Sequence, residues 1–125
     1  MSRRVLLVDD DADIRAIARL SLERIGGWEV VEADGGEAAL AAVPRGESFD
    51  AVLLDVMMPG LDGPATLARL REGHLQPAVP IVFLTAKSQH AECERLLALG
   101  AAGTIAKPFD PLALPAELER ACAPS

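Results

Sequence analysis

The 125-residue chain contains few cysteines and no long apolar run, and each absence excludes a class of protein. Cys93 and Cys122 have no partners at metal-ligand spacing, so we expect buried, reduced thiols rather than a zinc site or a disulfide. No apolar run approaches the roughly 20 residues of a membrane helix. The run that follows Arg3 and Arg4 covers only residues 5–8, whereas a secretory signal needs roughly 7–15 apolar residues. We therefore expect a cytoplasmic protein that does not associate with membranes.

Basic residues are also in deficit. The chain has 12 Lys+Arg against 19 Asp+Glu, which gives a formal net charge of −7 and a pI near 4.7. This charge disfavours direct nucleic-acid binding and suits a site in which several carboxylates hold a cation. Half of the residues are hydrophobic, so length and composition together predict one folded domain over residues 1–125.

Apolar runs alternate with segments of helical periodicity along the whole chain. We predict strands over residues 3–8, 28–33, 49–54, 80–84 and 103–106. Helices are expected to begin near Asp11, Gly36, Gly63, Ser88 and Asp110. This alternation is typical of a parallel sheet with helices on both faces. Glutamates in the second strand suggest an edge position, so we predict an α/β fold with five helices and the flavodoxin-like strand order 2-1-3-4-5.

Chemically complementary side chains stand at the ends of four predicted strands. They are Asp9-Asp10-Asp11 after the first strand, Asp55 after the third, Thr85 after the fourth and Lys107 after the fifth. Each has an ordinary interpretation by itself: an acidic run as a solvated helix start, a threonine as a cap, and Lys-Pro as a loop. Because open α/β sheets place their ligands at the carboxyl ends of strands, we expect these groups to meet around Asp55 and form a site.

Clustered carboxylates repel one another unless they are protonated or bind a cation. Ligation by carboxylate oxygens, a carbonyl and water is typical of Mg²⁺ (or Mn²⁺), and the absence of soft ligands beside Asp9, Asp10 and Asp55 argues against zinc. With Lys107 nearby, the pattern indicates a phosphoryl-transfer site in which cationic groups neutralise the phosphoryl oxygens. Asp55 can itself act as the nucleophile and form an aspartyl phosphate.

Four motifs together resemble the receiver domain of two-component response regulators, in particular its chemotaxis-regulator-like members. They are residues 5–11 (VLLVDDD), 54–63 (LDVMMPGLDG), 84–86 (LTA) and 107–109 (KPF), and the resemblance covers essentially the whole chain. It implies that Asp55 is the phosphoacceptor and takes a phosphoryl group from a histidine kinase or a histidine phosphotransfer protein. Phosphorylation would switch a surface that binds a downstream protein. The domain would then be a signalling module rather than an enzyme, catalysing only reactions on its own aspartate.

The resemblance also implies roles for the other site residues. The ligands of Mg²⁺ would be Asp10, Asp55, the backbone carbonyl of Met57 and, through water, Asp9. The phosphoryl-binding and switch residues would be Thr85, Ala86 and Lys107. In similar proteins the positions of Met57 and Lys87 modulate reaction rates. Methionine cannot orient an attacking water, so we expect no help with autodephosphorylation, whereas Lys87 could contact the phosphoryl group or a nearby carboxylate.

One position departs from the family pattern. Three residues before the lysine, where the family often has Tyr or Phe, this chain has Thr104. Phosphorylation would not need an aromatic side chain there, but the route of the signal to the face formed by the fourth helix, fifth strand and fifth helix would change. We interpret Thr104 as a strand residue with high β propensity rather than as a hydrogen-bonding switch.

Three other functions fit the sequence less well. The alternative of a pseudo-receiver, an interaction module independent of phosphorylation, predicts the loss of an acid, threonine or lysine that this chain retains. A flavodoxin needs a phosphate-binding loop after the first strand, where Asp9 and Asp10 would repel phosphate. A haloacid-dehalogenase-like phosphatase needs a carboxylate at the position of Met57. For the receiver we expect a monomer or weak dimer.

Overall fold

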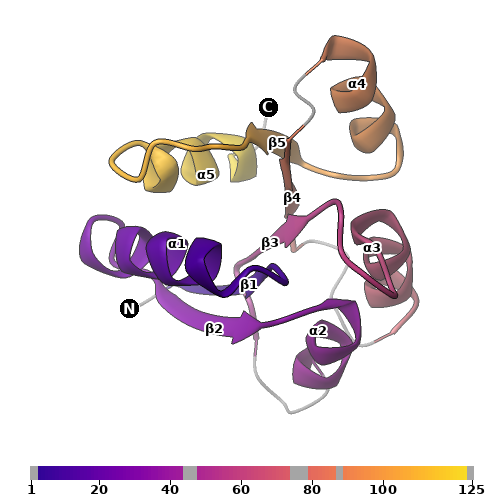
Figure 1. The fold of residues 1–125 in the computed structure, drawn as a ribbon, viewed down its shortest axis with the longest axis horizontal. Coiled ribbons are helices and arrows are strands. Elements are labelled where there is room, and N and C mark those ends of the chain that lie inside the picture. Colours follow the sequence, from indigo (N-terminus) through magenta and orange to yellow (C-terminus); the bar gives the residue numbers. More distant parts are fainter. Residues whose placement is uncertain (1–2, 44–47, 74–78, 87–88, 124–125) are drawn as a thin grey trace.

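The computed structural model describes residues 3–43, 48–73, 79–86 and 89–123, which form a five-stranded sheet (Figure 1). The strands are β1 (Arg4–Val8), β2 (Glu29–Ala33), β3 (Ala51–Asp55), β4 (Ile81–Thr85) and β5 (Gly103–Ala106). Their order is β2-β1-β3-β4-β5, and all four pairings are parallel. The predicted α/β fold, strand order and edge position of β2 are confirmed.

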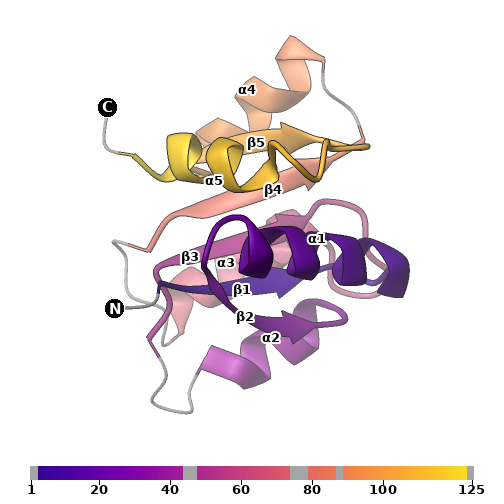
Figure 2. The same ribbon diagram turned by 90° about the vertical axis from the view of Figure 1, so that its left-hand side faces the viewer.

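Five helices in the described residues alternate with the strands. They are α1 (Ala12–Arg24), α2 (Gly36–Ala42), α3 (Gly63–Glu72), α4 (His90–Ala98) and α5 (Leu114–Cys122). Helices α1 and α5 cover one face of the sheet, and α2, α3 and α4 cover the other (Figures 1 and 2). Within the part of the chain that the structure describes, none of the helices has the length and apolarity needed to span a bilayer.

The central strands are buried on both faces, which explains why the sequence shows continuous apolar runs rather than alternating ones. Successive side chains enter opposite layers of the core. Leu54 and Phe83 pack under α2, α3 and α4, whereas their neighbours Leu53 and Leu84 pack under α1 and α5. The carboxyl edge of the sheet is therefore the end of a well-packed core.

Aspartate side chains cap two of the helices that lead away from this edge, α1 and α3. Asp11 accepts hydrogen bonds from the N–H groups of Asp13 and Ile14 at 2.9 and 3.3 Å, at the start of α1. Asp62 accepts one from the N–H of Ala65 at 2.9 Å, at the start of α3. Such caps satisfy donors that the first helical turn leaves free. Of the three consecutive aspartates, Asp11 is thus the one used for capping.

Helix α5 begins later than the sequence predicts, at Leu114 rather than near Asp110. A helix that included Pro111 would need the N–H of Pro115 to bond to the Pro111 carbonyl, and proline has no N–H. The hydroxyl of Ser21 on α1 donates to that carbonyl instead. Pro115 lies in the first turn of α5, where a missing donor costs nothing. This arrangement ties the connection between β5 and α5 to α1.

Helix α3 approaches the end of β3 so closely that only glycine fits at its first position. A Cβ atom on Gly63 would overlap the carbonyl oxygen of Asp55 and lie 2.8 Å from Val56 Cα and 2.9 Å from Phe83 Cε1. The Gly63 N–H donates to the Val56 carbonyl at 2.9 Å. The contact of Gly63 with Val56 therefore holds together the two ends of the loop between β3 and α3.

Two leucines near the start of α5 provide a test of this packing. Leu114→Ala should lower the free energy of unfolding by about 2–5 kcal/mol, because the side chain is fully buried and its removal leaves a cavity. Leu112, in the preceding turn, is 77% exposed, and Leu112→Ala should change the free energy of unfolding by less than about 0.5 kcal/mol. Denaturant unfolding measures both. Equal losses would contradict the late start of α5.

Candidate functional site

The carboxyl ends of β1, β3, β4 and β5 meet at one edge of the sheet. Val8 pairs with Leu54, so the residues that follow β1 lie beside Asp55 at the end of β3. At the other side, Thr85 at the end of β4 pairs with Ala106, immediately before Lys107. The strand order thus brings together the groups that the sequence places at four separate strand ends.

Three carboxylates form an acidic cluster at this edge. Asp9, Asp10 and Asp55 each offer an oxygen, and these oxygens lie within 4.8 Å of one another. Asp9 is fully buried and Asp55 is 5% exposed, whereas Asp10 lies at the surface. Like charges at this separation repel, and burial removes much of the water that would screen them. The cluster therefore requires cationic partners.

Lys107 is such a partner. Its Nζ lies 3.0 Å from Asp55 Oδ1, to which it donates a hydrogen bond, and 2.7 Å from Asp9 Oδ2. The contact with Asp9 is an ion pair without hydrogen-bonding geometry, so Oδ2 is a buried oxygen that no described group hydrogen-bonds. The N–H of Lys107 donates to the Thr85 carbonyl at 2.8 Å, which holds the lysine backbone at the site.

The acidic cluster fits a hard divalent cation. One lysine against three carboxylates leaves an excess of negative charge, and the available ligands are all oxygens. Asp9 Oδ2 is buried and has unused acceptor capacity. Carboxylate oxygens of this kind suit Mg²⁺ or Mn²⁺ rather than zinc, which favours thiolate and imidazole ligands.

Burial and mutual repulsion change the proton affinity of these groups. Burial raises the pKa of Asp55 to about 6; the Lys107 hydrogen bond opposes this shift, and the charges of Asp9 and Asp10 add to it. For Lys107, burial lowers the pKa, but the attraction of the Asp9 and Asp55 carboxylates outweighs this effect and leaves the pKa above its ordinary value. Lys107 therefore remains charged at neutral pH, while Asp55 is poised to bind or release a proton.

The family to which the chain belongs can be stated from sequence comparison. A family model described as the response regulator receiver domain matches residues 5–119. The chain belongs to this family. ResD of Bacillus subtilis, a transcriptional regulatory protein, is 39% identical over 108 residues, which are 86% of this chain and 43% of ResD. The phosphate regulon regulator PhoB of Pseudomonas aeruginosa is 36% identical over 119 residues, which are 95% of this chain and 51% of PhoB.

The receiver domain spans about half the length of these two relatives. Among solved structures, that of the chemotaxis response regulator CheY4 of Vibrio cholerae superposes with a TM-score of 0.89 at 32% identity. The superposition covers 97% of this chain and 99% of CheY4. This chain is thus a receiver domain of a two-component response regulator, in both sequence family and fold.

Other predicted site residues of the receiver lie at or just after the ends of β3 and β4. Thr85 is buried at the end of β4, and Ala86, which follows it, is exposed. Met57 is 71% exposed, whereas its neighbour Met58 packs into the core under α2, α3 and α4. Lys87 lies outside the described residues.

Thr104 is a half-buried residue of β5 that also contacts α4. Its Oγ1 lies 3.4 Å from the Sγ of Cys93, a hydrogen bond between strand and helix. Cys93 and Cys122 are both free thiols, as predicted, although each is half-buried rather than fully buried. Thr104 lies in strand β5, and its hydroxyl also contacts α4; the interpretation that it is a strand residue rather than a hydrogen-bonding switch stays a prediction.

Sequence reasoning missed Arg15. This residue of α1 donates from Nη1 to the backbone carbonyl of Asp9 at 2.7 Å. A signal was present in the sequence, since a basic residue one turn into a helix lies where the macrodipole disfavours positive charge. Its compensating partner, Glu32 on β2, is distant in sequence and visible only in the fold.

The raised pKa of Asp55 predicts a pH-dependent stability. The native pKa is about 6 against 3.8 in the unfolded chain, so the native state holds the proton more tightly. That stabilisation is complete below pH 3.8 and is lost as the pH rises through about 6. Asparagine does not titrate, so the free energy of unfolding of Asp55→Asn relative to wild type should rise over this window and level off above it.

Urea unfolding in metal-free buffer, from about pH 4 to about pH 8, measures this difference. Asp13→Asn is the matched control, because Asp13 is exposed and lies outside the acidic cluster. A constant difference between Asp55→Asn and wild type across the range would contradict the raised pKa.

Proposed function

We propose that this receiver accepts a phosphoryl group on Asp55 from a histidine kinase or a histidine phosphotransfer protein, in a reaction that requires Mg²⁺ or Mn²⁺. The observation that supports the proposal best is the position of Lys107 Nζ, 3.0 Å from Asp55 and 2.7 Å from Asp9. Burying such charges together costs stability, and sites that do so are commonly functional. Nothing in the structure or the relatives supports the alternative of a phosphorylation-independent pseudo-receiver.

Asp55 is the proposed nucleophile. Neutral pH lies above the Asp55 pKa of about 6, so the carboxylate is mostly ionised. One carboxylate oxygen attacks the phosphorus, a P–O bond forms as the P–N bond to the donor histidine breaks, and the imidazole leaves. Lys107, held in its charged form by the two aspartates, pairs with the phosphoryl oxygens in the product.

The proposed ligands of the cation are Asp10, Asp55, the backbone carbonyl of Met57 and, through water, Asp9. When bound, the cation neutralises charge on the phosphoryl oxygens. The chain prepares the Asp9 carboxylate for this role, since its Oδ1 accepts a hydrogen bond from the N–H of Asp11 at 2.9 Å. That bond leaves Oδ2 facing Lys107 in the acidic cluster.

The residues next to the acidic cluster are proposed to set the lifetime and the readout of the phosphorylated state. Thr85 hydrogen-bonds to the phosphoryl group, and the small Ala86 leaves space for the donor. Met57 points largely into solvent and has no polar hydrogen with which to orient a water, so it does not assist hydrolysis.

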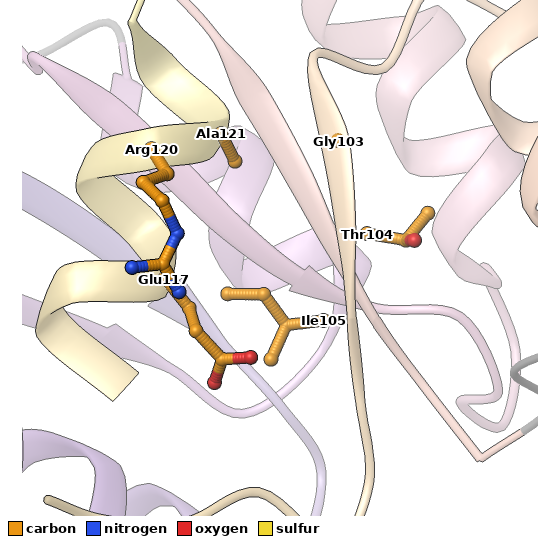
Figure 3. Close-up of a pocket in the computed structure, with 6 residues that line it drawn as sticks. All are labelled: Gly103, Thr104, Ile105, Glu117, Arg120 and Ala121. Carbon is orange, nitrogen blue, oxygen red and sulfur yellow. The ribbon is translucent and has the colours of Figure 1, made fainter. Parts of the chain in front are cut away.

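The proposed output surface is formed by α4, β5 and α5, and it binds a downstream protein. A hollow of about 320 Å³ lies on the α5 side of β5 (Figure 3). It is lined by Gly103, Thr104, Ile105, Glu117, Arg120 and Ala121. The Thr104 side chain points away from α5 in Figure 3, and its hydroxyl reaches Cys93 on α4. Because Lys107 directly follows β5, its movement toward a phosphoryl group would act on both sides of this strand.

The proposed setting of the receiver follows from its charge and composition. With a net charge of −7, the domain formed by residues 1–125 would contact proteins rather than nucleic acid or membranes. We propose a cytoplasmic signalling domain, monomeric or weakly dimeric, whose only catalysis is on its own Asp55.

Intact mass spectrometry tests the proposed reaction. Incubation with acetyl phosphate and Mg²⁺ should add the mass of one phosphoryl group to the wild-type protein. Asp55→Asn should gain none, because the nucleophilic carboxylate is gone. Asp13→Asn should react like wild type, because its carboxylate lies outside the acidic cluster. Removal of Mg²⁺ with a chelator should abolish the adduct.

The two variants separate a specific reaction from general acylation or phosphorylation of the surface. An adduct of equal yield on Asp55→Asn would contradict Asp55 as the acceptor. Absence of any adduct on wild type, both with acetyl phosphate and with phosphorylated histidine phosphotransfer proteins, would contradict the proposed function itself.

A further inference from the structure

Arg15 connects helix α1 and strand β2 to the loop that carries the acidic cluster. Its Nη1 donates to the backbone carbonyl of Asp9 at 2.7 Å, and its Nε donates to Glu32 Oε1 at 3.2 Å. The side chain is only 18% exposed, and both partners are acceptors that a guanidinium can engage at once. Helix α1 lies over β1 and β2 in both views of the fold (Figures 1 and 2), and the Arg15 side chain bonds to Glu32 of β2 and to Asp9 directly after β1.

The carbonyl that Arg15 binds belongs to the peptide between Asp9 and Asp10, two members of the acidic cluster. The chain holds the Asp9 side of this peptide by two further bonds: its N–H donates to the Ala33 carbonyl at 3.2 Å, and its Oδ1 accepts from the Asp11 N–H. By contrast, no described group hydrogen-bonds to the Asp10 carboxylate. The position from which the Asp10 side chain extends is therefore set by the backbone that carries it.

We propose that Arg15 is a positioning residue for the divalent cation. By holding the Asp9 carbonyl, it fixes the plane of the peptide that precedes Asp10 and so presents the Asp10 carboxylate toward Asp9 and Asp55. The inference rests on the proposed function in that it assigns the cation to this cluster. Partners that orient the ligands of a metal typically change metal affinity by about 10–100-fold when they are removed.

Positioning and simple electrostatics predict opposite outcomes for the loss of Arg15. A positive charge near the acidic cluster repels a divalent cation, so removing it would strengthen binding if charge were its main effect. If Arg15 positions Asp10, removing it must weaken binding. The sign of the change in affinity therefore decides between the two accounts.

Arg19 provides a matched control on the same helix. It pairs with the same glutamate, with Nη1 2.6 Å from Glu32 Oε2, and also with Glu23 at 3.2 Å. Its side chain is 44% exposed, and it makes no described bond to the loop that carries the acidic cluster. Arg19→Gln removes one positive charge and one bond to Glu32 without touching the Asp9 carbonyl.

The experiment measures Mn²⁺ affinity by calorimetric titration of wild type, Arg15→Gln, Arg15→Lys and Arg19→Gln. Arg15→Gln should bind Mn²⁺ about 10-fold more weakly, whereas Arg19→Gln should stay within about 2-fold of wild type. Arg15→Lys keeps the charge but cannot donate to both acceptors from one planar group, so its Mn²⁺ affinity should lie between those of Arg15→Gln and Arg19→Gln.

Phosphorylation by acetyl phosphate provides a second assay. Arg15→Gln should need about 10-fold more Mg²⁺ for half-maximal rate and keep its maximal rate within about 2-fold of wild type.

The outcomes of the two assays are separable. Equal or tighter Mn²⁺ binding by Arg15→Gln would overturn the positioning role, and so would an equal loss in Arg19→Gln. If Arg15→Gln does not fold, Arg15→Lys decides, and its binding as tightly as wild type would overturn the proposal. A wild-type protein that binds Mn²⁺ but gains no phosphoryl group would contradict the proposed function and leave the Mn²⁺ comparison between the variants intact.

Discussion

Two carboxylates can be buried at the end of this apolar sheet because a lysine from another strand lies between them. Asp9 follows β1, Asp55 ends β3 and Lys107 follows β5, so the contact exists only when all three strands are in place. The same contact leaves the site under-neutralised, since Asp10 adds a third negative charge. Burial then raises the pKa of Asp55, whose carboxylate is still ionised at neutral pH. A site with these properties could hold a cation, and it supports the proposed transfer of a phosphoryl group.

The surrounding elements hold this arrangement from both sides. Gly63 allows α3 to close against the backbone of Asp55, and Arg15 ties the loop after β1 to α1 and β2. Beside Lys107, the backbone N–H of this residue donates a hydrogen bond to Thr85 of β4, and Thr104 of β5 is hydrogen-bonded to Cys93 on α4. A change at Lys107 would therefore reach α4 through a strand.

The sequence predicts the fold and the centre of the site because both depend on simple rules. Alternating apolar runs and helical segments specify the parallel sheet, and the strand order then brings Asp9 and Asp55 together without any knowledge of side-chain packing. Pro115, which disfavours a helix that includes Pro111, is visible in the sequence, but the hydroxyl of Ser21 that bonds to the Pro111 carbonyl lies 90 residues away and could not be predicted in this way. The contact of Arg15 with the Asp9 carbonyl and the different burial of Met57 and Met58 also depend on three-dimensional packing that a local pattern does not encode.

We propose that the acidic cluster of Asp9, Asp10 and Asp55 binds a divalent cation, and anomalous diffraction would detect the ion itself. Crystals grown with Mn²⁺ and measured at the manganese absorption edge would locate the ion without reference to activity. We expect one anomalous peak within coordination distance of oxygens from this cluster, and its loss in crystals of Asp10→Asn. A peak elsewhere on the molecule, or none in the cluster at saturating Mn²⁺, would contradict the account.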